Sequence, residues 1–148
     1  MKGFKNFMFL FILMLSMPMM LQAQTDRIEK STVEILNKSD HFAMGVTNAR
    51  GLKGAYGMYQ KFQNSGVKLK RFEVVIWGAV VKDLKKGTEL HDYIKAQEVK
   101  GLQVTVCQIA LDYFDISKED LPYDIKVVPD AHVRLFELQA LGYNLIVI

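Results

Sequence analysis

The stretch Phe72-Glu-Val-Val-Ile-Trp77 is apolar at every position but one, and Gly78 ends it. A strand with one face in water alternates apolar and polar residues, whereas a strand of a parallel sheet is buried on both faces and is apolar almost throughout. The stretch therefore predicts a central strand of a parallel sheet. Because helices must then cover the faces of that sheet, it also predicts an α/β fold.

The amino-terminal half continues this pattern with one strand and one helix. Residues 42–47 alternate bulky and small side chains, which predicts a first strand. Apolar residues then recur at helical spacing from residue 52 to residue 62, and Asn-Ser-Gly at 64–66 ends that helix. Residues 24–40 are polar and weakly patterned, and their pattern leaves open whether they form a short edge strand or a helical turn.

The carboxyl half alternates strands and helices in the same way. We expect a helix over 89–100, strands over 102–106 and 124–128, a helix capped by Asp130 and a last strand over 143–148. Short links between elements favour parallel strands joined by right-handed crossovers. The predicted fold is a three-layer α/β sandwich with a mostly parallel sheet of about five strands and helices on both faces.

Three glycines fall on the first predicted helix at intervals of three residues. Gly51, Gly54 and Gly57 would form a stripe without side chains. Each interior glycine costs about 1 kcal/mol relative to alanine. We therefore expect a compensating close approach, either to the sheet or to a second subunit.

The amino terminus has the three-part layout of a secretory signal peptide. Lys2 and Lys5 make a basic start, residues 7–21 are almost wholly apolar, and Leu-Gln-Ala at 21–23 forms a cleavage site. A membrane anchor needs roughly 20 apolar residues, and this run is shorter and contains Pro18. Cleavage after Ala23 is therefore favoured over an uncleaved anchor.

Residues 24–148 are then a single mature domain of 125 residues. Removing the signal peptide takes away two lysines and no acidic residue, which leaves 17 basic and 16 acidic residues. A charge this close to balance favours neither nucleic acid nor an anionic membrane as a partner. We expect a periplasmic or secreted protein that leaves the membrane after cleavage.

The single cysteine, Cys107, directly follows the predicted strand 102–106. It excludes an internal disulfide, and its position excludes lipoprotein processing, which needs a cysteine at the cleavage point. A short helix is predicted from Gln108 to Phe114. A thiol at a helix amino terminus faces unpaired backbone N–H groups, which favour the thiolate form. Cysteine is also among the most buried residue types, so simple packing is the alternative.

Ligands of parallel sheets bind beyond the carboxyl ends of the strands. Those ends place Asn48, Trp77 and Gly78 around Cys107 in the predicted pocket. The backbone N–H groups of Gln108 and Ile109 are the expected donors to a sulfur anion.

Several stretches resemble the DsrE/DsrF-like family in order and in spacing. Residues 72–78 are similar to the family's second strand and the glycine after it. Four further stretches are similar to the carboxyl half of the family. They are Val104-Thr-Val-Cys-Gln-Ile-Ala-Leu111, Ile116-Ser-Lys-Glu-Asp-Leu121, Val127-Val-Pro129 and Leu135-Phe-Glu-Leu-Gln-Ala-Leu-Gly-Tyr143. The similarity covers residues 42–148 and is strongest after residue 72.

The resemblance implies a small α/β protein that assembles as a trimer or hexamer. Several members pass persulfide sulfur from one cysteine to the next, and Cys107 stands at the position of that cysteine. The resemblance thus implies at most a sulfur carrier or a sulfurtransferase-like protein with donor and acceptor partners, and leaves open whether it is an enzyme. Sulfur-relay members are mostly cytoplasmic, so the signal peptide departs from the family pattern.

Two alternatives to the sulfur carrier stand beside it. The chain can be a binding or scaffold oligomer in which Cys107 only packs, or a redox protein that pairs Cys107 between chains. We expect no metal and no cofactor, because His41, His91 and His132 lie in separate segments without metal-ligand spacing. His132 follows the helix cap Asp130, a position from which it can approach a strand end, but an exposed surface residue is the favoured interpretation.

Overall fold

The computed structural model describes residues 27–148, apart from residues 98 and 123–124. The predicted signal peptide lies outside the described residues. Five strands form one sheet in the order β4-β3-β2-β1-β5, and every neighbouring pair is parallel. The strands are β1 His41–Val46, β2 Arg71–Ile76, β3 Leu102–Cys107, β4 Lys126–Val128 and β5 Asn144–Val147. The predicted α/β fold with a parallel sheet is confirmed.

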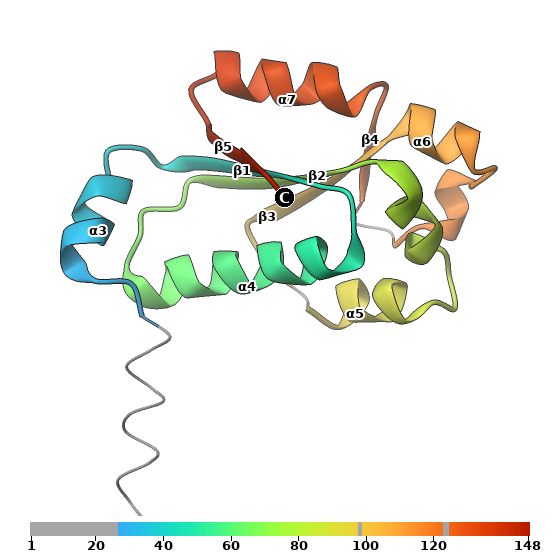
Figure 1. The fold of residues 1–148 in the computed structure, drawn as a ribbon. Helices are drawn as coiled ribbons and strands as arrows, with labels where there is room; N and C mark the ends of the chain where they lie inside the picture. Colours follow the sequence, from blue (N-terminus) through green and yellow to red (C-terminus); the bar gives the residue numbers. More distant parts are fainter. Residues whose placement is uncertain (1–26, 98, 123–124) are drawn as a thin grey trace, which may run out of the picture.

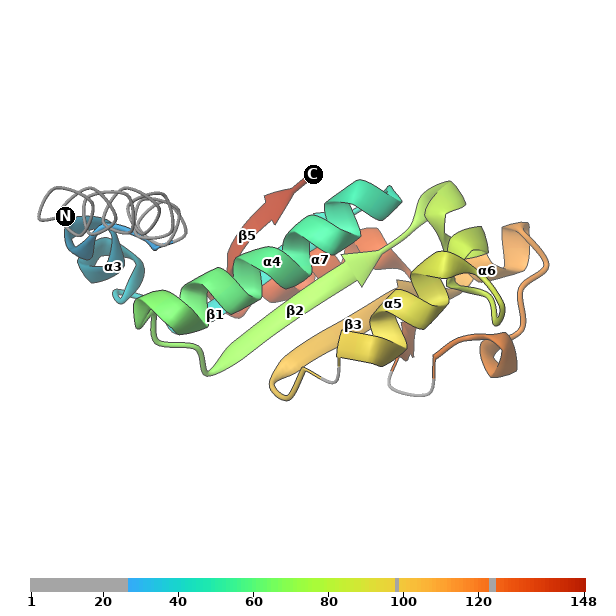
Figure 2. The same ribbon diagram turned by 90° about the horizontal axis from the view of Figure 1, so that it is seen from below.

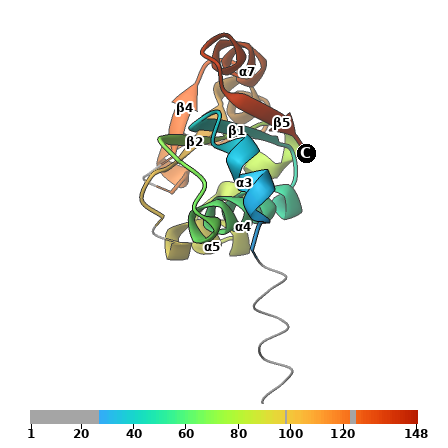
Figure 3. The ribbon, with the colours of Figure 1, turned by 90° about the vertical axis from the view of Figure 1, so that its left-hand side faces the viewer.

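Helices and 3-10 helices connect these strands. The α-helices are α3 Lys30–Leu36, α4 Ala49–Ser65, α5 Glu89–Gln97, α6 Gln108–Tyr113 and α7 Ala131–Ala140, and the 3-10 helices are η1 Gly78–Leu84 and η2 Lys118–Asp120. Helices α4 and α5 cover one face of the sheet and α7 covers the other (Figures 1 and 3).

The chirality of the connections explains why α7 lies on the opposite face. From β1 to β4 the chain steps along the sheet in one direction, and α7 then brings it back to β5 beside β1. Since parallel crossovers are right-handed, a step in the reverse direction puts its helix on the other face. The chain therefore changes face as it leaves β4, next to the carboxyl end of β3.

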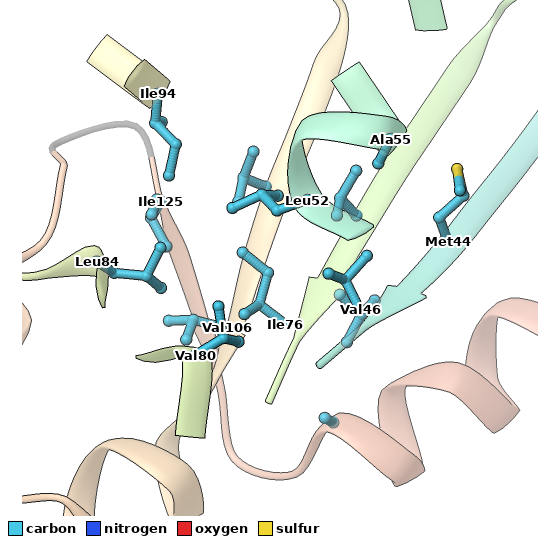
Figure 4. Packing of buried hydrophobic residues seen from close by; sticks show 14 of the residues in the cluster. Met44, Val46, Leu52, Ala55, Ile76, Val80, Leu84, Ile94, Val106 and Ile125 are labelled. Carbon is cyan, nitrogen blue, oxygen red and sulfur yellow. The ribbon is translucent and has the colours of Figure 1, made fainter. Parts of the chain in front are cut away.

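The core lies between the sheet and α4, as the apolar strands require. Five of the six residues of β2 are buried, and Leu52 of α4 is fully buried against the strands. Figure 4 shows Leu52, Ile76 and Val106 meeting in this layer, with Val80 of η1 beside them. A sheet buried on both faces in this way fixes the positions of its strand ends.

Two regions differ from or complete the sequence predictions. Residues 30–36, left open between strand and helix, form α3. Its Val33 and Leu36 pack partly against the core, and it lies beside the carboxyl end of α4 (Figure 2). The 3-10 helix η1 after β2 was not predicted from the sequence.

The glycine stripe on α4 packs on the sheet at one position. A Cβ on Gly51 would lie 3.2 Å from Val46, whereas one on Gly54 or Gly57 would meet nothing within 4 Å. The expected approach to the sheet is therefore wrong for Gly54 and Gly57. No helix within the described part of the chain is both long and apolar enough to cross a membrane.

Candidate functional site

Cys107 lies at the carboxyl end of β3, where the chain turns into α6. Its side chain is 5% exposed. As the N-cap residue of α6 it has an extended backbone, yet its sulfur makes no capping hydrogen bond to that helix. The sulfur is thus free to interact with a different element.

That element is the amino terminus of α7. Val128 at the end of β4 pairs with Cys107, so the two strand ends lie side by side. Asp130 caps α7 by accepting hydrogen bonds from the N–H groups of His132 and Val133. The N–H of Ala131, the first residue of α7, donates to Sγ of Cys107 at 3.4 Å. The sulfur therefore accepts from one of the backbone N–H groups of α7 that have no partner within the helix.

A cavity of about 310 Å³ opens beside the sulfur, and we call it the Cys107 pocket. Its walls come from the turn after β2, from α6 and from the start of α7. They are mostly apolar and comprise Trp77, Gly78, Cys107, Ile109, Ala110, Tyr113, Phe114, Asp130 and His132. The thiol of Cys107 thus borders an apolar space at the carboxyl edge of the sheet.

Trp77 and His132 meet across this pocket. Their ring centroids are 5.4 Å apart and the ring planes cross at 63°. Gly45 leaves room for the indole, because a Cβ there would lie 2.9 Å from the Trp77 ring. Gly78 has a φ of 76°, which allows the chain to turn sharply after Trp77.

A comparison with protein families finds a match over most of the chain. The model of the DsrE/DsrF-like family matches residues 31–148. The chain belongs to this family. The resemblance inferred from residues 42–148 is thus confirmed, and the family match adds residues 31–41, which include most of α3.

Solved structures share the fold of this DsrE-family protein. A protein of unknown function from Methanobacterium thermoautotrophicum has a TM-score of 0.62 at 17% identity, covering 74% of this chain and 100% of the other. Another, from Bacteroides thetaiotaomicron, has a TM-score of 0.54 at 21% identity, covering 72% and 94%. No curated protein matches the chain. The structural likenesses therefore concern the fold alone.

The residues expected around the cysteine divide into two groups. Trp77, Gly78 and Ile109 line the Cys107 pocket. Asn48 instead caps α4, where its Oδ1 accepts from the N–H of Gly51 at 2.8 Å. Gln108 is expected to offer its backbone N–H to the sulfur, and its side-chain amide donates to Asp112 at 2.6 Å. The side chains of these last two residues are occupied outside the pocket lining.

The amino end of α7 was missed as part of the site. The Asp130 cap was recognised from the sequence, but nothing in the sequence places it next to Cys107. The side chain of His132 is 66% exposed, as expected of a surface residue, and it also lines the pocket. Its Nδ1 lies 3.5 Å from Oδ1 of Asp130. The pairing of β4 with β3 brings these groups together.

The pocket contains few polar groups that can hold a cofactor. Besides the sulfur, its ionisable side chains are Asp130, His132 and Tyr113. Across the described residues, no group of three or more His, Cys, Asp or Glu side chains is arranged to bind a metal ion. The arrangement provides a sulfur nucleophile, one N–H donor and apolar walls, which suits attack on a sulfur–sulfur bond.

Proposed function

We propose that this protein carries sulfane sulfur on Cys107 as a persulfide. The observation that supports this function best is the Ala131 N–H donated to Sγ at the edge of an open pocket. A backbone N–H at a helix amino terminus stabilises a sulfur anion through its partial positive charge and through the helix dipole. A cysteine that only filled space would need neither the donor nor the pocket.

The transfer balances without an added oxidant. The Cys107 thiolate attacks the outer sulfur of a donor persulfide R–S–SH, a new S–S bond forms and the donor's S–S bond breaks. The donor leaves as a thiolate that takes up a proton. An acceptor thiolate then attacks the outer sulfur on Cys107 and restores the Cys107 thiolate. Donor and acceptor proteins are the partners that this cycle requires.

We further propose that the transfer takes place outside the cytoplasm. The basic start and the apolar run of residues 7–21 support export and cleavage after Ala23. The mature chain is then the carrier, in the periplasm or beyond the cell.

The carrier is proposed to be a homo-oligomer, a trimer or hexamer as in other members of the family. Helix α7 supports this assembly because Val133 and Phe136 on its outer side are 54% and 71% exposed. They lie within one turn of each other, and apolar side chains exposed together on one helix face commonly mark a contact with another chain.

The scaffold alternative is favoured by one observation, the 5% exposure of Cys107. Such burial also opposes a disulfide between two chains, because both sulfur atoms must come within bonding distance. In a scaffold protein the thiol would react with small reagents only when the fold opens.

Cold cyanolysis distinguishes these functions. The protein is incubated with polysulfide, desalted and treated with cyanide, which removes sulfane sulfur as thiocyanate. A carrier yields about one thiocyanate per chain, and the Cys107→Ser variant yields none. Absence of thiocyanate from the wild type, together with alkylation of Cys107 only on unfolding, would favour the scaffold.

A further inference from the structure

A second and larger cavity lies far from Cys107. It measures about 860 Å³ and is formed by α3, the carboxyl half of α4 and the first residues of β1 and β5, and we call it the α3–α4 groove. It lies on the α4 face near the amino ends of the strands, whereas the Cys107 pocket lies at their carboxyl ends. The two sites therefore share no residue.

The walls of the groove expose bulky apolar side chains. Ile35 of α3 is 63% exposed and Ile146 of β5 is 52% exposed, and both line the groove. Met58 and Leu145 are half-buried on the same surface. Helix α3 thus places Ile35 and Leu36 on the groove, while Val33 and Leu36 also pack partly against the core. Exposed apolar side chains gathered in one concavity are typical of a ligand site.

The charges of the groove have one sign. Lys38 and Lys61 line it, and no carboxylate does. Within the described residues, neither ammonium group makes an ion pair. Lysines in such positions cover apolar surface with their methylene groups and keep the ammonium in water. The groove therefore combines an apolar floor with unpaired positive charge.

We propose that the α3–α4 groove binds a long-chain carboxylate, a single-chain fatty acid in monomeric form. The alkyl chain lies along the apolar walls and the carboxylate pairs with Lys38 and Lys61. The volume of the groove falls within the range of small-molecule sites, about 300–1,000 Å³. This site is independent of sulfur transfer at Cys107.

Fluorescence of cis-parinaric acid measures this binding. The protein is expressed from the full sequence and purified as the cell processes it, with its amino terminus identified by intact mass. The probe gains fluorescence in the groove, and hexadecanoate displaces it. Each methylene removed from the competing acid weakens displacement about fourfold. Hexadecanol, which lacks the charge, displaces the probe at least about tenfold more weakly than hexadecanoate does.

Matched variants locate the site. The double variant K38Q/K61Q weakens hexadecanoate binding about tenfold and leaves hexadecanol binding unchanged. K126Q changes an exposed lysine of β4 outside the groove and has no effect. I146D puts a carboxylate on an exposed position of the groove and abolishes binding of the probe. Circular dichroism checks that each variant is folded.

Three results would overturn the proposal. One is the absence of probe binding by the wild type, and another is binding that K38Q/K61Q and I146D leave intact. The third is binding to vesicles of anionic phospholipid but not to the monomeric acid, which would assign the groove to a membrane surface. If I146D instead dissociates an oligomer in gel filtration while the wild type binds no fatty acid, the groove is a contact between copies of the chain.

Discussion

The backbone N–H of Ala131 lies 3.4 Å from Sγ of Cys107, although 24 residues separate them in the sequence. The contact exists because β4 pairs with β3 and the chain then turns directly into α7. Asp130 fixes the geometry of that turn through its cap. The reactivity of Cys107 should therefore depend on Asp130.

Neutralising Asp130 should make Cys107 more reactive. In D130N the asparagine still caps α7, and the pocket loses a negative charge that opposes the thiolate. We expect alkylation by iodoacetate to become several-fold faster and alkylation by neutral iodoacetamide to change less. E34Q, which neutralises an exposed carboxylate on α3, is the control. D130A, which removes the cap, should instead lower stability by about 1 kcal/mol. Equal rates for D130N and the wild type would contradict this electrostatic account.

Two glycine variants should change stability in opposite directions. In G45A the new Cβ lies 2.9 Å from the Trp77 ring and 3.0 Å from Val147, so the unfolding free energy should fall by about 1–3 kcal/mol. In G54A, on the exposed side of α4, nothing lies within 4 Å and the unfolding free energy should rise by about 1 kcal/mol. Urea unfolding followed by circular dichroism measures both.

The variants G45A and G54A also test how Trp77 packs in the wall of the Cys107 pocket. Trp77 is the only tryptophan of the chain, so its emission spectrum describes the pocket directly. G45A should shift the emission maximum and G54A should not. A G45A protein with unchanged emission and stability would mean that the indole does not rest on Gly45.

An ion pair between the half-buried Arg134 and the buried Glu73 should couple α7 to the sheet. Arg134 donates to both carboxylate oxygens of Glu73, at 2.9 and 2.8 Å, and Thr105 donates to the same carboxylate. The hydrogen bonds that Arg134 donates to Glu73 hold the pKa of Arg134 above its usual value, so the guanidinium stays charged. R134L leaves a buried carboxylate without its partner and should cost about 3 kcal/mol.

The double variant E73L/R134L tests this coupling. Because it removes both charges, it should be more stable than R134L alone. Chemical unfolding of the wild type, E73L, R134L and the double variant gives the interaction free energy. Additive losses would show that the pair contributes no coupling.

Stability should decline in alkaline solution partly through Tyr59. Burial raises the pKa of Tyr59, and a hydrogen bond from Gln63 lowers it by a smaller amount. The unfolded tyrosine has a pKa of about 10, so this contribution is full below about pH 10 and is lost as pH rises through the folded value. Y59F also loses the hydrogen bond to the carbonyl of Lys100.

Urea midpoints measured between about pH 8 and pH 11 check this prediction. Y59F should be less stable than the wild type at the lower pH, and its stability should fall less steeply above about pH 10. Burial also raises the pKa of Tyr93, so part of the decline in stability with rising pH remains in Y59F. Parallel curves for the two proteins would contradict the assignment to Tyr59.

The fold was predictable because its strands are continuous apolar segments. The run 72–77 can only be buried on both faces, and the alternation of strands and helices then specifies a parallel sheet. Helix α3 was not predicted, because it packs on the core only through Val33 and Leu36 and so leaves a weak pattern. The 3-10 helix η1 was missed because a short irregular turn has no clear period.

The candidate site was predictable only where it depends on strand ends. Trp77, Gly78 and Cys107 follow β2 and β3 or end them, and all three line the pocket. The donor to the sulfur is a backbone group, so no residue type marks it in the sequence. Its position depends on which strand pairs with β3, a property of the sheet order and not of any local segment.

The central claim is that Cys107 carries sulfane sulfur, and intact mass spectrometry of polysulfide-treated protein tests it most directly. The account predicts a gain of about one sulfur atom per chain, reversed by a reductant and absent from Cys107→Ser. An unchanged mass for the folded wild type, with alkylation of Cys107 only after unfolding, would contradict it.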